Sequence, residues 1–284
     1  MSYLKIVGGV LIWAVINGFV IKNISHSVSP TVLGALMSLV GVVLYLPYLV
    51  FKAKVNLNSR QLKLLLCLGL AAALNNSFFY TALAITKIAN AALVHYFASV
   101  IAIVWIAFVP AFKEKIDKAS SISIALGVIG LFIMIGSGWL RHELWLYLAL
   151  ISAFFYSWEI VFSKQVSSSE VPAHLSSFTK LSFQLIIMPV MGLILGQSFK
   201  VPSNSYPAII MAGLLLFISF ILVFSGLKDR RISTKHFAVI GYFDRLGAIG
   251  IGYLWWGERF GWNVWLGGLL ILIAEVPILF SKKE

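Results

Sequence analysis

The chain has 284 residues, of which 60% are hydrophobic and only 11% are charged. This composition excludes an ordinary soluble domain, in which about a quarter of the residues carry a charge. The net charge of +12 does not indicate a nucleic-acid partner. The Lys and Arg residues instead cluster in short gaps between long apolar runs, which is typical of proteins that cross a membrane many times.

Windows of about 20 residues, the length that a helix needs to cross the hydrocarbon core, predict ten spans along the chain. They lie at residues 4–21, 31–51, 62–82, 90–110, 119–137, 144–163, 174–195, 207–227, 236–256 and 262–280. The connections are short and leave no room for a soluble domain. The first run lacks a small-residue cleavage site, so we expect it to be retained as a span. The sequence therefore predicts an all-α membrane protein.

The basic residues predict how the spans are oriented. If the N-terminus is cytoplasmic, the inner segments carry about three times as many Lys and Arg residues as the outer loops, which is the usual bias. We therefore expect a multi-pass protein of the cytoplasmic membrane with both termini on the cytoplasmic side. Six tryptophans flank two predicted outer loops, where indole rings favour the headgroup level. They are Trp139, Trp145, Trp255, Trp256, Trp262 and Trp265.

Two stretches of the chain resemble each other. The Tyr-Phe pair at 96–97 in the fourth span matches the pair at 242–243 in the ninth, and a Glu beside a basic residue follows each span, at Glu114 and Glu258. The chain thus divides into two halves of five spans. Because five is odd, the second half must enter the membrane in the opposite orientation, which predicts an inverted-topology repeat. The halves are residues 1–139 and 140–284.

These motifs resemble the EamA-type members of the drug/metabolite transporter superfamily. The resemblance is carried by ALAITKIANAALVHYF, by FKEKIDKASSISIALGVIGLFIMIG and by the later echo WWGERFGWNVWLGGLLILIAEVPI, and it extends over nearly the whole chain. It implies a helical bundle of inverted repeats with a central cavity lined by spans from both halves, including the fourth and ninth. It also implies secondary transport without a cofactor, and export more often than import.

Charged residues within the spans are the first candidates for a substrate site, because a charge at membrane depth costs several kcal/mol unless it faces a partner or a wet cavity. Asp244 and Arg245 lie near the middle of the ninth span. As neighbours on a helix, their side chains should diverge by about 100°. Arg245 could hold a substrate carboxylate or phosphate through its planar fork. The structural alternative is an ion pair of Arg245 with Glu159 or Glu275 on another helix.

Glu159 in the sixth span and Lys180 in the seventh have similar predicted depths. They could pair across the two helices, or each could extend to the cytoplasmic interface. Lys180 is also a candidate substrate ligand. Glu159 is the candidate for proton coupling, because carboxyl groups at membrane depth often carry protons in transporters.

The remaining predicted substrate ligands are uncharged polar side chains within the spans. They are His95, Tyr96, Ser99, Tyr242 and Asn76. The histidine could donate or accept a hydrogen bond, or it could be a satisfied core residue. The tyrosines could line a cavity or simply pack. Amides at this depth, including Asn75 and Asn17, are by default bonds between helices. Asn17 is the weakest ligand candidate of these.

Groups of both charge signs at membrane depth favour a secondary transporter of small polar metabolites, such as amino acids. Export is expected from the family resemblance, and protons are a candidate coupling ion. The alternative within the same fold is an organic-anion or sugar-phosphate exchanger. In that case Lys180 and Arg245 would face one cavity with the neighbouring carboxylates turned away.

A membrane enzyme or a lipid-handling scaffold is the alternative from a different class. The sequence has no convergent catalytic set, nucleotide-binding loop or zinc motif that would favour an enzyme. The expected partners are a small-molecule substrate and the lipid bilayer, without nucleic acid, cofactor or metal. The chain is expected to act as a monomer or a homodimer.

Overall fold

The computed structural model describes residues 1–52, 56–109, 118–136 and 143–279, and every regular element within them is a helix. The first half contains α1 (Ser2–Val15), the π-helix η1 (Ile16–Ile21), α2 (Lys22–Ile24), α3 (Pro30–Lys52), α4 (Ser59–Ile85), α5 (Ile88–Phe108) and α6 (Lys118–Ile135). The second half contains α7 (Leu144–Ser168), α8 (Ala173–Ile194), the 3₁₀-helix η3 (Ser203–Ser205), α9 (Tyr206–Leu227), α10 (Thr234–Ile240), α11 (Tyr242–Leu254) and α12 (Trp262–Leu279). The all-α prediction is confirmed.

Within the described ranges, eight helical segments are long and apolar enough to cross a membrane. They coincide with eight of the ten predicted spans, and α1, η1 and α2 form one of them as a continuous segment from Ser2 to Ile24. The other two predicted spans coincide with α6 and α12, whose apolar parts are shorter, at Ser121–Met134 and Trp262–Ala274. A count of ten membrane spans therefore stays a prediction, while the multi-pass character is clear.

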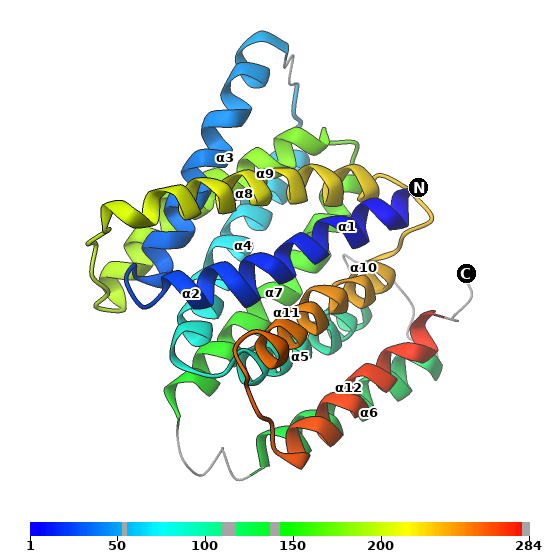
Figure 1. Cartoon of the computed structure of the whole chain (residues 1–284). Helices are drawn as coiled ribbons and strands as arrows, with labels where there is room; N and C mark the ends of the chain where they lie inside the picture. The colour runs from blue at the N-terminus through cyan, green and yellow to red at the C-terminus, as the bar shows by residue number, and fades with distance from the viewer. Residues whose placement is uncertain (53–55, 110–117, 137–142, 280–284) are drawn as a thin grey trace.

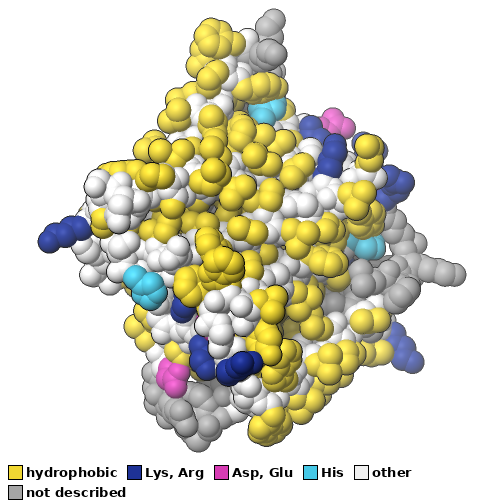
Figure 2. Space-filling model, in the orientation of Figure 1, with side chains coloured by type: hydrophobic (Ala, Val, Ile, Leu, Met, Phe, Trp, Pro, Cys, Tyr) yellow, Lys and Arg dark blue, Asp and Glu magenta, His cyan; other side chains and the backbone are white. Residues whose placement is uncertain are grey.

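The outside of the bundle is apolar, as expected for a surface that faces lipid. Large side chains such as Val50, Phe51, Leu193 and Leu254 are more than two-thirds exposed. In the view of Figure 2, apolar side chains cover much of the face, and most of the Lys and Arg residues lie toward its edges. A soluble monomer rarely exposes contiguous apolar patches of this extent. The chain therefore carries its apolar residues on the surface as well as in the core.

Helix contacts in the two halves correspond when the helices are matched in chain order. The contact of α4 with α7 has its counterpart in that of α9 with α1, and the contact of α5 with α7 has its counterpart in that of α11 with α1. Helices α6 and α12 are matched with each other and form one pair. Figure 1 shows α1 beside α9, with the pair of α6 and α12 set to one side.

Two lysines at matching positions cap helix ends. Lys22 lies as many residues after the start of α1 as Lys164 lies after the start of α7. The Nζ atom of Lys22 donates a hydrogen bond of 2.5 Å to the carbonyl of Thr86, just after α4 ends. The Nζ atom of Lys164 donates to the carbonyls of Leu227 and Asp229, at 3.1 and 3.2 Å, where α9 ends. A cation at the C-terminal end of a helix satisfies free carbonyls and the helix dipole.

Helices α6 and α12 approach closely at two glycines. A Cβ atom added to Gly130 would lie 2.7 Å from the carbonyl oxygen of Gly267, and one added to Gly267 would also collide with Gly130. Small residues at such contacts allow the backbones of membrane helices to pack against each other. The pair thus depends on the missing side chains of both glycines.

Candidate functional site

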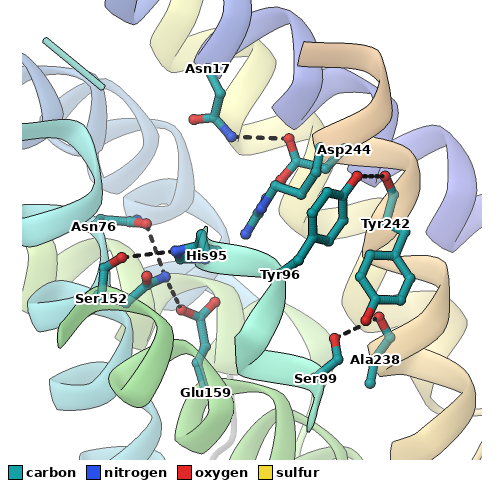
Figure 3. A network of polar contacts seen from close by, with 12 residues as sticks. Asn17, Asn76, His95, Tyr96, Ser99, Ser152, Glu159, Ala238, Tyr242 and Asp244 are labelled. Carbon is teal, nitrogen blue, oxygen red and sulfur yellow. Dashed lines mark hydrogen bonds and ion pairs between the residues drawn. The ribbon is translucent and has the colours of Figure 1, made fainter. Parts of the chain in front are cut away.

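Two helical segments depart from regular α geometry where they face each other. The segment that begins with α1 contains η1. The segment that corresponds to the ninth predicted span is interrupted at Gly241, between α10 and α11. Asn17 lies in η1 and Asp244 in the first turn of α11. The Nδ2 atom of Asn17 donates a 3.0 Å hydrogen bond to Oδ1 of Asp244 (Figure 3). π-helical turns and broken membrane helices often occur at functional sites.

The counterion of Arg245 is Asp244, its own neighbour in the chain. The guanidinium group contacts the carboxylate, so the two side chains do not diverge as predicted for a regular helix. The long Arg245 side chain bends back because aromatic faces hold its guanidinium group, 5.1 Å from the ring centroid of Phe79 and 4.8 Å from that of Tyr156. The predicted structural pairing with Glu159 is therefore not adopted. The side chain of Glu275, the other predicted partner, lies outside the described residues.

Glu159 and Lys180 form a second ion pair, which joins α7 to α8. The Nζ atom of Lys180 lies 2.5 Å from Oε1 of Glu159, and Asn75 of α4 donates a 2.9 Å hydrogen bond to Oε2. The ammonium group also lies 4.1 Å from the ring centroid of Phe220 and 5.3 Å from that of Trp13. With the Lys180 side chain only 2% exposed, the structure adopts pairing rather than extension to the interface.

Both ion pairs line one small cavity between helices of the two halves. Its lining residues are Trp13, Ile16, Asn17, Asn75, Asn76, Phe79, Tyr80, Tyr156, Glu159, Lys180, Leu216, Phe220, Asp244 and Arg245. About 30 Å³ of it is open to the centre of a water molecule, which is room for about two waters. The side chains that line the cavity, including its own charged groups, thus leave little free space in it. A metabolite could enter only after the helices or side chains had moved.

Five of the predicted site residues line this cavity. They are Arg245, Asp244, Asn76 and Lys180 from the predicted substrate ligands, and Glu159, the candidate for proton coupling. The sequence placed them on four different spans, and the fold brings them together. Their roles as ligands stay predictions.

His95 is buried behind the cavity wall and does not line the cavity. Its Nδ1 atom lies 2.9 Å from Oγ of Ser152, and its ring packs on Phe79 and Tyr156 with centroids 4.2 and 4.7 Å apart. This arrangement matches the alternative interpretation, a core histidine bonded to a serine. The same two aromatic rings contact Arg245 on the cavity side, so His95 supports the wall that holds the guanidinium group.

Three further predicted ligands lie outside the cavity lining, where α5 faces α10 and α11. They are Tyr96, Ser99 and Tyr242. The hydroxyl of Tyr96 donates a 3.0 Å hydrogen bond to the carbonyl of Tyr242, and the two rings are 4.5 Å apart. Ser99 donates to the carbonyl of Ala238 at 3.4 Å (Figure 3). The tyrosines occupy matching positions in the two halves.

Sequence reasoning did not place several residues in the cavity. For Asn17 it expected a hydrogen bond between helices, and the bond to Asp244 is of this kind. Asn17 lies as many residues after the start of α1 as Glu159 lies after the start of α7. The two residues are thus equivalent in the first and sixth segments. Aligning the two halves by the starts of their spans would have matched Asn17 with Glu159 and so indicated a place for it in the cavity. The aromatic lining residues carried no signal, because an aromatic position in a span most often serves packing.

The end of α11 is fastened to both neighbouring segments. Oε1 of Glu258 accepts a 2.9 Å hydrogen bond from the backbone N–H of Ile88, the first residue of α5. The indole N–H of Trp256 donates to the carbonyl of Gly18 in η1, at 2.8 Å. Glu258 therefore acts as a structural anchor, through a helix N-terminus rather than through the basic residue beside it. Glu114, the matching residue after the fourth predicted span, lies outside the described residues.

A helical bundle with an apolar surface, segments of membrane-spanning length and a charged cavity between its two halves has the architecture of a multi-pass membrane transporter. The comparisons agree: the model of the EamA-like transporter family matches residues 1–136 and 143–280. The chain belongs to this family and is a membrane transporter of the drug/metabolite transporter superfamily. Members of the family are transporters and not enzymes.

Similarity to solved structures concerns the fold alone. A structure described as "Crystal structure of protein" aligns with a TM-score of 0.68 over 98% of this chain and 98% of its own, at 16% sequence identity. Among curated proteins, none matches the sequence.

Proposed function

We propose that this transporter moves small zwitterionic metabolites, with amino acids as the leading class, out of the cell across the cytoplasmic membrane. The observation that carries this proposal is the pairing of both charge signs in one small cavity. Two carboxylates and two cations lie there among amide and aromatic groups. A substrate with one carboxylate and one ammonium group can replace such internal pairs without leaving a buried charge uncompensated.

Arg245 is the proposed partner of the substrate carboxylate, because its fork can form two parallel hydrogen bonds. Glu159 is the proposed partner of the substrate ammonium group. Asn17, Asn75 and Asn76 supply amides that can donate to carboxylates or accept from ammonium groups. A substrate would thus bind across the cavity, with one pole toward α11 and the other toward α7.

The second candidate function is exchange of organic anions or sugar phosphates. It requires Lys180 and Arg245 to face the cavity while the carboxylates turn away. Both cations do line the cavity, which supports anion binding in part. The contacts of Lys180 with Glu159 and of Arg245 with Asp244 favour the zwitterion, because each cation has its counterion beside it.

Alternating access through an inverted repeat is the proposed mechanism. It is supported by the corresponding helix contacts, by the matching lysine caps and by the contact between Tyr96 and Tyr242. Halves of similar structure can exchange conformations around a site at their interface. In this mechanism the small cavity would open toward one side of the membrane at a time. Export is proposed from the family resemblance.

The test is transport of a mixture of radiolabelled amino acids in proteoliposomes of defined orientation. Wild type is compared with Arg245→Ala and Asp244→Asn, for both net flux and counterflow. We expect saturable flux in wild type and a loss of about 100-fold in the folded variants, because each leaves an opposite charge unpaired at membrane depth. No flux in folded wild type would contradict the amino-acid proposal and direct the search to phosphorylated anions. Transport that is faster from the cytoplasmic side of the protein to the opposite side than in the reverse direction would support export.

A further inference from the structure

The ammonium group of Lys180 occupies a site suited to the ammonium group of a substrate. It is held by the Glu159 carboxylate at 2.5 Å, by the face of Phe220 at 4.1 Å and by that of Trp13 at 5.3 Å. A carboxylate combined with aromatic faces is the usual environment for a bound organic cation. In this structure the protein fills that environment with its own side chain.

The two cations of the cavity are attached in different ways. Arg245 contacts a carboxylate on the same helix, one residue away. Lys180 extends from α8 to a carboxylate on α7, and its flexible four-carbon stem can withdraw while both helices stay in place. Since the cavity has room for only about two waters, a substrate ammonium group can reach Glu159 only when Lys180 leaves it.

We propose that Lys180 is a tethered counter-cation, which neutralises Glu159 in the empty transporter and is displaced from it by the ammonium group of the substrate. This inference rests on the proposed transport of zwitterions and specifies how that site is reset. When the substrate leaves, Lys180 returns to Glu159. The empty transporter can then change conformation with no uncompensated carboxylate in its apolar centre, and it needs no proton or other ion from solution.

Without Lys180, the empty transporter must neutralise Glu159 from solution, and a proton is the available cation. The predicted role of Glu159 in proton coupling would then appear in the variant and not in the wild type. Several other charged or titratable groups face the same region. They are Tyr80 of α4, Tyr156 of α7, Asp244 and Arg245 of α11, and His95 of α5 behind the wall. The pH dependence of a variant must therefore be shown to depend on Glu159 itself.

The first test uses the wild-type protein, which carries no risk of misfolding. Net efflux of the radiolabelled amino acids is measured from proteoliposomes with and without a pH gradient, and with the membrane potential set by potassium and valinomycin. The proposal expects efflux without any gradient, with less than about a twofold change on applying either one, because only the net charge of a zwitterion crosses with each cycle. Efflux that requires a proton gradient would overturn it.

The second test compares net efflux with counterflow, since only net efflux requires the empty transporter to change conformation. In Lys180→Met the ratio of net efflux to counterflow should fall about tenfold or more at pH 8. The reason is that the empty transporter must then change conformation with the Glu159 carboxylate unpaired in its apolar centre. The ratio should recover toward pH 5.5. Lys180→Arg should keep the wild-type ratio. Lys200→Met, which removes an exposed lysine, is the matched control.

The double variant Lys180→Met with Glu159→Gln tests whether the pH dependence comes from Glu159. Glu159 is also the proposed partner of the substrate ammonium group, so both fluxes should be weaker in this variant. The ratio of the remaining net efflux to the remaining counterflow, measured at raised substrate concentration, should no longer change with pH. A wild-type ratio in folded Lys180→Met would overturn the proposal, because Lys180 would then not be needed for the empty step. Loss of counterflow in this variant would also overturn it and assign Lys180 to substrate binding. Failure of the proposed function is a distinct result, because wild type would then show neither efflux nor counterflow of amino acids.

Discussion

The two halves of the chain use the same lysine in the same way, but they contribute different polar groups to the cavity. Lys22 and Lys164 cap corresponding helix ends with corresponding hydrogen bonds. Asn17 and Glu159, which precede these lysines by the same spacing, differ in charge. The comparison teaches that structural groups can keep the pattern of a repeat while the site between the halves becomes asymmetric. The proposed zwitterionic substrate, whose two poles differ, would fit such an asymmetric site.

The strongest test of the comparison is truncation at the two equivalent cavity positions. Glu159→Ala leaves Lys180 buried without a counterion and should destabilise the protein by about 3–5 kcal/mol. Asn17→Ala removes one hydrogen bond to Asp244 and should cost about 1–2 kcal/mol. Thermal unfolding in detergent, followed by size-exclusion chromatography, measures both. Equal losses would contradict the view that only one half carries the exchangeable charge.

The lysine caps offer the next test. Lys22→Met and Lys164→Met each remove charge-assisted hydrogen bonds to helix-end carbonyls and should each destabilise the protein by about 1.5–3 kcal/mol. The two losses should agree within about 1 kcal/mol if the caps are equivalent. The midpoints of unfolding in detergent provide the measurement, with Lys200→Met as the control. A clear loss in only one variant would break the correspondence between the halves.

The glycine contact between α6 and α12 should depend on both halves to a similar degree. Gly130→Val and Gly267→Val introduce side chains where backbone atoms of the facing helix lie, which should cost about 1–3 kcal/mol each. Gly250→Ala on α11 is the control, since nothing lies within 4 Å of its added Cβ atom. Unfolding midpoints that shift in the control as much as in the two valine variants would argue against a specific close contact.

The smallest expected effect concerns pH at the end of α9. Side-chain and backbone hydrogen bonds from Arg231 hold the pKa of the Asp229 carboxyl below its usual value. Because the folded-state pKa is lowered, this interaction stabilises the protein above about pH 4 and is lost as the pH falls further. Asp229→Asn should thus be slightly less stable than wild type at pH 7, with the difference narrowing in acid. Thr86, at the matching helix end, cannot show such a dependence.

The positions of the helices could be predicted from the sequence because the length of an apolar run is set directly by the thickness of the bilayer. The charged cavity residues Asp244, Arg245, Glu159 and Lys180 could also be identified, since charges at membrane depth are costly and therefore informative. The pairing of Glu159 with Lys180 was one of two alternatives that their similar depths allowed, and the structure adopts it.

The partner of Arg245 could not be predicted, because aromatic faces from two other helices decide where its guanidinium group lies. The partner of Asn17 could not be predicted either. Its amide faces Asp244 from within η1, and the local sequence gives no signal for a π-helix. In both cases the deciding contacts come from segments that are distant in the chain. Local periodicity carries no information about such contacts.

The small size of the cavity has a consequence for the membrane itself. About two waters fit among the rings of Trp13, Phe79 and Phe220, which is too few to bridge a hydrocarbon core about 30 Å thick. Within the described part of the chain, this cavity by itself therefore offers protons and small ions no continuous file of water. A cell could keep many copies in its membrane without discharging the gradients on which its energy supply depends.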